Sequence, residues 1–269
     1  MISQYETIFV YEKGCEHMAS EHKPTLRVLS VLEQVSAGTG KYTLSELSRS
    51  LDIPVSTLFP IVRTLREHQY LDYDQAAQTY SLGYRLFEIG SRIQNTNAYE
   101  SLVEMMWKIV DGCGETCHFG ILDRGDVLYL AKVDPKQQPI RMYSMIGRRL
   151  AAYGTGIGKA LLRDFTLEQL RETYPGGLRP LTAHTVTDFS ELYRQLQEIK
   201  ATGFAYENEE SNESVRCIAV PVESGGRVAA ALSVAMPVFR YDDRKKRCAE
   251  QLLRDAAGYA EKIVPHLHF

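Results

Sequence analysis

The stretch TLSELSRSLDIPVSTLFPIVRTLREHQYLDYDQAAQTYSLG, residues 43–83, contains the patterns that predict how the N-terminal part of the chain folds. It opens with Thr43 followed by Glu46, a capping-box pattern that predicts the start of a helix. Residues 52–54 (DIP) interrupt this helix, because proline disfavours helical continuation. A second apolar set then recurs at helical spacing, and its members are Leu58, Ile61, Val62 and Leu65. The stretch therefore predicts two short helices separated by a tight turn.

The same stretch ends in a predicted β-hairpin. Residues 70–73 (YLDY) and 79–82 (TYSL) flank a short polar turn, which is the pattern of two paired strands. Two helices across a tight turn, followed by a hairpin, form a winged helix-turn-helix whose second helix enters the major groove of DNA. The sequence therefore predicts that this part of the chain binds double-stranded DNA.

The second helix would bury its apolar side chains and leave an outward face for DNA. The outward positions near its start are Ser56, Thr57, Phe59, Pro60, Arg63 and Thr64. Hydroxyl groups bind bases or phosphates, a phenyl ring can contact a thymine methyl group, and arginine pairs with guanine or phosphate. In the hairpin turn, Gln78 could approach the DNA backbone or the minor groove. An ordinary solvent-facing helix and a plain surface turn are the alternatives.

Pro60 constrains where the second helix begins. A proline in a helix interior lacks an N–H group and clashes with the preceding turn, whereas the first turn tolerates it. We therefore expect the helix to begin at Ser56 or Thr57, with Ser56 as its N-cap.

Composition and charge narrow the class of protein. The 269 residues are 44% hydrophobic and 24% charged, as in soluble globular proteins, and no apolar run reaches membrane-spanning length. The five cysteines form an odd, scattered set that fits reduced thiols, so we expect a cytoplasmic location. The net charge is −3, and residues 24–94 hold seven basic and seven acidic side chains. This balance argues against strong nonspecific affinity for phosphate.

Helical and strand-like segments alternate in the second half of the chain. Antiparallel strand pairs with flanking helices predict an α+β domain. We predict four parts: an N-terminal extension at residues 1–23, a winged helix-turn-helix at 24–83, a linker helix at 84–97 and an α+β domain at 98–269.

Three segments of the second domain have the composition of a ligand site. Residues 147–159 (GRRLAAYGTGIGK) offer backbone N–H groups at a predicted helix start, which suits a small anion, but they match neither dinucleotide-binding nor P-loop spacing. Residues 207–217 (ENEESNESVRC) form an acidic loop that leads into an apolar strand. The strand at residues 231–235 (ALSVA) carries Ser233, whose hydroxyl group is either satisfied locally or available to a ligand.

The helix-turn-helix, residues 147–159 and residues 203–222 (GFAYENEESNESVRCIAVPV), in this order and spacing, resemble the IclR family of bacterial transcription regulators. The resemblance extends from about Pro24 to the C-terminus. It implies a GAF-like effector domain, a homodimer or homotetramer, and control by a small organic acid. The family's ligand-binding positions correspond here to Gly156, Ile157, Glu207, Cys217 and Ser233.

The sequence departs from the family pattern in three places. Ala235 stands where a second serine often occurs, which implies one hydrogen bond fewer to the ligand. Tyr153 lies in a run (AAYG, residues 151–154) that replaces the family's usual Pro-Leu-His-Ala, so we expect Tyr153 to shape the mouth of the pocket. Pro60 stands where arginine is common, which implies a different operator preference.

These observations predict a one-component transcription regulator, a repressor of a catabolic operon. Two copies would read a near-palindromic operator, because dimer symmetry is mirrored in the DNA. The effector is predicted to be a carboxylate-bearing metabolite, with N–H groups of Gly156 and Ile157 on the carboxylate and Ser233 and Glu207 on hydroxyl groups. Because Glu207 would repel a bare dicarboxylate, a hydroxylated sugar acid fits better than oxalate or succinate. We predict no catalytic residue, cofactor, metal or membrane partner.

Rival interpretations stay open at this point. The second domain could be a metabolic enzyme that uses Cys217 or Glu207, with His118 or His184 approaching in space. The protein could also be a DNA-binding scaffold without a ligand. Residues 113–118 (CGETCH) could hold a metal, although no second pair of ligands matches them.

Overall fold

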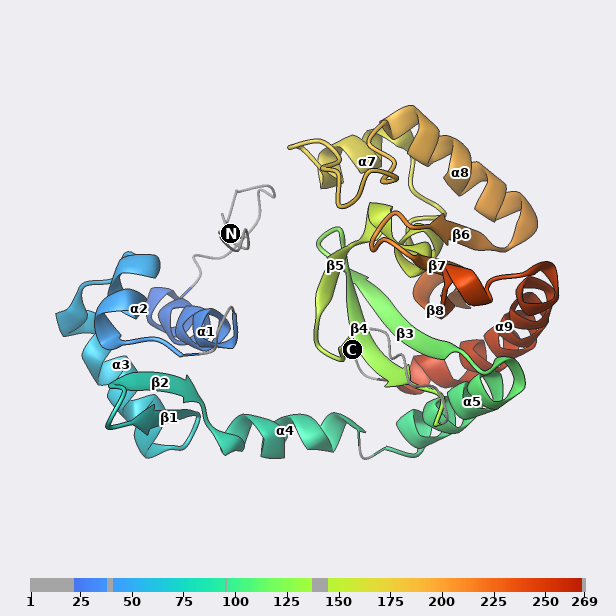
Figure 1. Cartoon of the computed structure of the whole chain (residues 1–269). Helices are drawn as coiled ribbons and strands as arrows, with labels where there is room; N and C mark the ends of the chain where they lie inside the picture. Colours follow the sequence, from blue (N-terminus) through green and yellow to red (C-terminus); the bar gives the residue numbers. More distant parts are fainter. Residues whose placement is uncertain (1–21, 38–40, 95, 137–144, 268–269) are drawn as a thin grey trace. The chain divides into compact units, whose positions relative to one another are not determined.

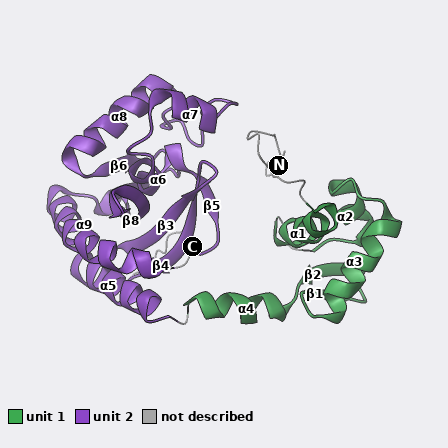
Figure 2. Ribbon diagram, turned by 180° about the vertical axis from the view of Figure 1, so that it is seen from behind, with its two compact units in different colours: residues 1–94 green, residues 95–269 purple. Residues whose placement is uncertain are grey.

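The computed structural model describes residues 22–37, 41–94, 96–136 and 145–267. The chain divides into two units, residues 1–94 and 95–269, and each is described by itself (Figure 2). Most of the predicted N-terminal extension, residues 1–21, lies outside the described residues. The described chain begins with His22, which precedes the first helix.

The first unit combines helices with a two-stranded sheet (Figure 1). Its described elements are α1 (Lys23–Ser36), α2 (Leu44–Ser50), α3 (Val55–Glu67), β1 (Leu71–Asp74), β2 (Thr79–Leu82) and α4 (Tyr84–Gln94). The predicted capping box forms at the start of α2: the Thr43 hydroxyl accepts from the N–H of Glu46, and the Glu46 carboxylate accepts from the N–H of Thr43. This unit is the helix-turn-helix with its wing that the sequence predicted.

An apolar core holds the helices of the first unit together. Its fully buried members are Val31, Val35, Leu47, Leu58 and Val62. The wing pairs antiparallel, with Leu71 opposite Leu82, and the carboxylate of Asp74 closes its turn by accepting from the N–H groups of Ala76 and Ala77. Tyr80 of β2 is buried and bridges to Tyr42 before α2, so the wing is anchored to the helical core.

The start of α3 differs from the prediction. The helix begins at Val55 and its N-cap is Pro54, whose carbonyl oxygen accepts from the N–H groups of Thr57 and Leu58, both at 2.9 Å. Ser56 is therefore not the N-cap, and Pro60 lies in the helix interior rather than in the first turn. Pro54 supplies a fixed φ that leads into the helix, and the buried face of α3 outweighs the hydrogen bond that Pro60 cannot donate.

The second unit is built on an antiparallel sheet. Its described elements are α5 (Asn97–Cys113), β3 (Thr116–Asp123), β4 (Asp126–Val133), β5 (Arg149–Ala151), η1 (Ala152–Gly154), α6 (Gly156–Leu161), α7 (Leu167–Thr173), α8 (Phe189–Thr202), β6 (Ala205–Asn208), β7 (Val215–Ser224), β8 (Arg227–Pro237), η2 (Val238–Arg240), α9 (Asp243–Ile263) and η3 (Val264–His266). The strand order is β5-β4-β3-β8-β7-β6. Helices α5 and α9 pack together on the sheet, and α6, α7 and α8 belong to a second layer (Figures 1 and 2). This is the predicted α+β architecture.

The two faces of the central strands differ in the size of their side chains. Side chains alternate between the faces along each strand. The face toward α5 and α9 carries large apolar residues, which include Phe119, Ile218, Val220, Leu232 and Val234. The opposite face carries smaller or polar residues, which include His118, Gly120, Cys217, Ala219, Ser233 and Ala235. Small side chains on this second face allow α6 to approach the sheet.

Candidate functional sites

The outward face of α3 carries most of the side chains predicted to contact DNA. The exposed members are Ser56, Phe59, Arg63 and Thr64, while Thr57 is half-buried. Thr64 donates its hydroxyl proton to the carbonyl oxygen of Pro60 at 2.9 Å, so this hydroxyl is engaged within the helix. Gln78 lies in the turn of the wing, exposed and with a positive φ of 55°. The helix and the wing turn therefore present these groups to solvent.

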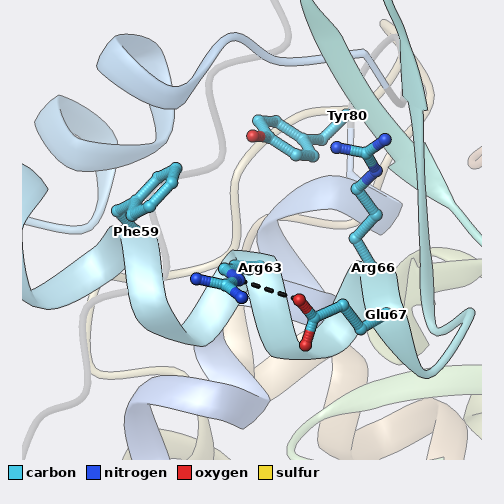
Figure 3. A pocket seen from close by; sticks show the side chains of 5 residues that line it. All are labelled: Phe59, Arg63, Arg66, Glu67 and Tyr80. Carbon is cyan, nitrogen blue, oxygen red and sulfur yellow. Dashed lines mark hydrogen bonds and ion pairs between the residues drawn. The ribbon is translucent and has the colours of Figure 1, made fainter.

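A hollow of about 580 Å³ lies beside this face of α3 (Figure 3). Its lining residues are Phe59, Arg63, Arg66, Glu67 and Tyr80. Nε of Arg63 donates to Oε1 of Glu67 at 2.8 Å. The guanidinium group of Arg66 lies 5.2 Å from the ring centre of Tyr73, as in a cation–π contact. The sequence interpretation missed Arg66, although its position three residues after Arg63 places it on the same side of a helix.

The predicted effector residues of α6, β6 and β7 come together in the second unit. A Cβ atom added at Gly156 would lie 3.1 Å from Cβ of Cys217 and 3.4 Å from Cβ of Glu207. Thr155 caps α6 by accepting from the N–H of Gly158 at 3.0 Å. Glycine at position 156 therefore lets the start of α6 lie directly against the paired residues Glu207 and Cys217.

Glu207 is a buried carboxylate with one oxygen satisfied and one not. It is 2% exposed, and its Oε1 accepts from the N–H of Glu210 at 2.6 Å and the N–H of Ser211 at 3.0 Å. Its Oε2 is buried without a hydrogen-bond partner. Burial raises the pKa of Glu207. The Cys217 thiol and the two N–H groups lower this pKa, but the effect of burial is larger. An orphan acceptor of this kind is where a ligand donor would bind.

We expect Glu207→Gln to become more stabilising, relative to the wild type, as the pH rises. Because the pKa of Glu207 is raised on folding, the folded state binds the proton more tightly, and ionisation of Glu207 opposes folding. The wild type retains this contribution below about pH 4 and loses it as the pH rises through the raised pKa. Urea denaturation of both proteins at several pH values measures the difference in the free energy of unfolding. A difference that grew toward acid pH would contradict this reading of Glu207.

Cys217 does not have the environment of a catalytic nucleophile. Burial and the neighbouring Glu207 raise the pKa of its thiol well above the usual range, and a protonated thiol is a poor nucleophile. His184 is exposed. The pKa of His118 is lowered to about 3, mainly by burial, so its imidazole stays neutral near pH 7. The environment of Cys217 therefore suits a residue that lines a ligand site better than a catalytic nucleophile.

Ser233 belongs to the same sheet face, one row along from Glu207 and Cys217. It is 2% exposed and lies opposite Ala219 on β7 and His118 on β3. The ring of Tyr129 on β4 packs against His118 edge-on, at 5.3 Å between ring centres. The sequence interpretation did not include His118 and Tyr129 among the predicted effector residues. Alternation along β3 predicts which residues of that strand share a face with His118. It places His118 on the face of Ser233 only when β3 pairs with β8, and the sequence alone does not reveal this pairing.

Two other predicted effector residues have different surroundings. The Tyr153 hydroxyl donates to the carbonyl oxygen of Arg179 at 2.9 Å and accepts from its N–H at 3.1 Å. The Tyr153 ring packs edge-on against Tyr174. Ile157 is buried in the apolar cluster between the sheet and α8, close to Gly120. In the described residues, no contact brings the Tyr153 hydroxyl to Glu207, so its observed role is to hold the loop at Arg179.

A buried ion pair lies next to the predicted effector residue Glu207. Nζ of Lys159 on α6 lies 2.5 Å and 2.7 Å from the two carboxylate oxygens of Glu210, and 2.7 Å from Oε1 of Gln195 on α8. Glu210 also donates its backbone N–H to Glu207. Its carbonyl oxygen accepts from the hydroxyl of Thr185 at 2.7 Å. The pair thus joins α6, α8 and the acidic loop, a connection that the sequence interpretation missed.

The CGETCH segment does not converge on a metal. Cys117 contributes to the apolar core under α5 and α9, whereas His118 points to the opposite face, because successive strand residues alternate. In the part of the chain that the structure describes, no group of three or more His, Cys, Asp or Glu side chains is arranged to hold a metal ion. Among the same residues, no helix is both long and apolar enough to cross a bilayer.

Comparison with known proteins extends over both units. The IclR helix-turn-helix domain matches residues 24–75, and the bacterial transcriptional regulator IclR C-terminal domain matches residues 91–261. The HTH-type transcriptional regulators KdgR and XynR of Escherichia coli (strain K12) are 32% and 31% identical over 235 residues, which is 86% of this chain and 89% and 92% of theirs. The HTH-type transcriptional repressor AllR of Salmonella typhimurium is 28% identical over 86% of each chain.

Solved structures share the fold. An IclR transcriptional regulator from Alicyclobacillus acidocaldarius matches with a TM-score of 0.83 at 23% identity, over 91% of this chain and 99% of that one. An IclR homologue from Microbacterium hydrocarbonoxydans, complexed with 4-hydroxybenzoate, matches with a TM-score of 0.75 at 24% identity, over 90% and 99%. KdgR, XynR and AllR are transcription regulators and not enzymes, so the enzyme interpretation is set aside. The chain belongs to the IclR family of bacterial transcriptional regulators.

Proposed function

We propose that this DNA-binding regulator is a repressor, and that a small hydroxylated carboxylic acid bound between α6 and the small-residue face of the sheet controls it. The observation that carries the choice of effector is Oε2 of Glu207, which is buried and has no hydrogen-bond partner. Leaving a buried acceptor unsatisfied costs about 1–3 kcal/mol. A ligand hydroxyl that donates to this oxygen would remove the cost, and the free energy recovered in this way would favour ligand binding.

The groups around Glu207 support a carboxylate on the same ligand. In the described residues, no hydrogen bond engages the N–H groups of Gly156 and Ile157 at the start of α6. Ser233 and the neutral imidazole of His118 occupy the next row of the sheet. An ionised Glu207 would repel a second carboxylate, so a sugar acid fits better than succinate or oxalate.

Calorimetric titration of the full chain tests this effector class. We expect gluconate, as a representative sugar acid, to bind and to raise the melting temperature, and succinate to do neither. Glu207→Gln should weaken gluconate binding about tenfold or more, because it replaces a charged acceptor. Glu209→Gln is the matched control and should leave binding unchanged. Binding of 4-hydroxybenzoate without any sugar acid would show that the aromatic pair His118 and Tyr129 decides the ligand class, contrary to the proposal.

A gel shift on the DNA upstream of the protein's own gene tests the regulatory half of the proposal. We expect a specific shift that is released by the sugar acid that binds in calorimetry. A specific shift together with no ligand effect from any acid would favour the scaffold interpretation. No shift even at low salt would contradict operator binding, since low salt strengthens every phosphate contact.

Helix α4 supports the proposal that the protein acts as a homodimer. Ile89 and Ile93, one turn apart, are 45% and 62% exposed on it. Exposed apolar residues at this spacing fit a helix that packs against a second copy. We expect Ile93→Asp to reduce self-association in analytical ultracentrifugation and to weaken operator binding about tenfold or more, because half-sites would be bound singly. Arg92→Gln, on the same turn, is the control and should change neither property.

A further inference from the structure

The ion pair between Arg63 and Glu67 lies on the face of α3 that would approach DNA. The two side chains are 66% and 56% exposed, and the bond joins Nε of Arg63 to Oε1 of Glu67 at 2.8 Å (Figure 3). Among the residues that the structure describes, Arg63 makes no other hydrogen bond or ion pair. The two terminal amino groups of Arg63 are therefore available to bind an acceptor pair, while its Nε is held by Glu67.

Glu67 has little to contribute to folding. An exposed ion pair between residues four apart on a helix stabilises a protein only slightly. Its charge also opposes DNA binding, because a carboxylate near the backbone repels phosphate. A favourable consequence of Glu67 for DNA binding must therefore come from what it does to Arg63.

The geometry favours a base contact over a phosphate contact for Arg63. A guanidinium fork matches O6 and N7 of guanine in the major groove. Phosphate is a poorer partner here, since it would sit beside the Glu67 carboxylate. Arg66 is the contrasting case, because it stacks on Tyr73 without an ion pair among the described residues and suits a phosphate.

We infer that Glu67 is a positioning residue for sequence readout. Resting on the proposed operator binding, this inference gives Glu67 two effects. By holding Nε, it aims the terminal amino groups of Arg63 at a guanine. By its charge, it weakens binding to DNA of any sequence. The first effect increases the ratio of operator affinity to nonspecific affinity, whereas the second lowers both affinities alike and leaves the ratio unchanged.

Measurement of that ratio tests the inference. The full chain first selects an operator from duplexes with a randomised centre, and fluorescence anisotropy then gives affinities for this operator and for a scrambled duplex over a salt series. We expect Glu67→Ala to strengthen binding to the scrambled duplex and to lower the affinity ratio about tenfold. Glu67→Gln keeps an acceptor for Nε, so it should strengthen binding to both duplexes and retain most of the ratio.

Three further variants separate positioning from general effects. Arg63→Ala should lower the ratio, and adding Glu67→Ala to it should not lower the ratio further, because the two residues act as one unit. Arg66→Ala should weaken both duplexes alike and reduce the salt slope by about one. Glu88→Gln removes an exposed acid paired with Arg85 outside α3 and should leave the ratio unchanged.

The outcomes distinguish this inference from the proposed function. If the wild type selects an operator but Glu67→Ala leaves the ratio unchanged, or lowers it equally without Arg63, the positioning role of Glu67 is overturned and operator binding stands. If the wild type selects no sequence, the proposed operator binding fails, and this inference with it. Melting curves should show all variants folded, as an exposed pair predicts.

Discussion

Lys159→Met is expected to lower the free energy of unfolding of the second unit by about 3–5 kcal/mol, because it leaves the buried carboxylate of Glu210 without its cation. The side chains of Lys159 and Glu210 are 1% and 8% exposed, so water cannot replace the lost partner. Calorimetry should show the melting temperature falling by roughly 10 °C. The response to effector should be lost as well, because Glu210 also donates to the Glu207 carboxylate.

A double variant and a surface variant control this prediction. Lys159→Met with Glu210→Gln removes both charges and should recover much of the lost stability. Arg194→Met breaks exposed ion pairs on α8 and should leave the free energy of unfolding almost unchanged. A small effect of Lys159→Met, comparable to that of Arg194→Met, would show that the pair is open to water in solution.

Gly158→Ala is expected to destabilise the second unit by about 3 kcal/mol or more, as strong overpacking does. An added Cβ atom would lie 2.2 Å from the carbonyl oxygen and 2.3 Å from Cα of Ala152. Both are backbone atoms of the turn that precedes α6, so no side chain can move aside to relieve the clash. The turn and the cap at Thr155 would have to shift, which also moves Gly156 away from Glu207 and Cys217.

Gly176→Ala is the matched control for Gly158→Ala. No atom lies within 4 Å of a Cβ added at Gly176, and its backbone is outside the left-handed region. Its effect on the free energy of unfolding should stay within about 0.5 kcal/mol. Urea denaturation compares the two variants, and similar losses in both would indicate a general cost of replacing glycine rather than close packing at position 158.

Local patterns predicted the first unit well. The capping box at Thr43, the apolar spacing of Leu58, Val62 and Leu65, and the hairpin around residues 74–79 all depend on neighbours within a few positions. The start of α3 was predicted wrongly. The prediction considered the hydrogen bond that Pro60 cannot donate but not the burial of the apolar face of α3, which outweighs that loss. The assignments to DNA contact stay predictions.

Composition singled out three candidate ligand segments, and the family resemblance then assigned the predicted effector residues within them. Glu207 and Cys217 face each other across β6 and β7, but the acidic run at residues 207–213 reads equally well as a solvated loop. In the sequence, Lys159 ends a glycine-rich segment and Glu210 lies in that acidic loop, and neither pattern indicates an ion pair between them. Its two members are 51 positions apart in the chain.

Sequence patterns were sufficient to predict the elements whose causes are local: the helix-turn-helix, the wing, the capping box at Thr43 and the α+β alternation of the second unit. Hydrogen bonds and apolar spacing within a few residues are sufficient for these. Four features became visible only in the folded chain: β3 lies beside β8, His118 and Ser233 share a face, Lys159 meets Glu210, and one oxygen of Glu207 is left without a partner. Burial and strand pairing bring together residues that are far apart in the chain. The free energy of a buried polar group depends on whether these contacts include a hydrogen-bond partner for it.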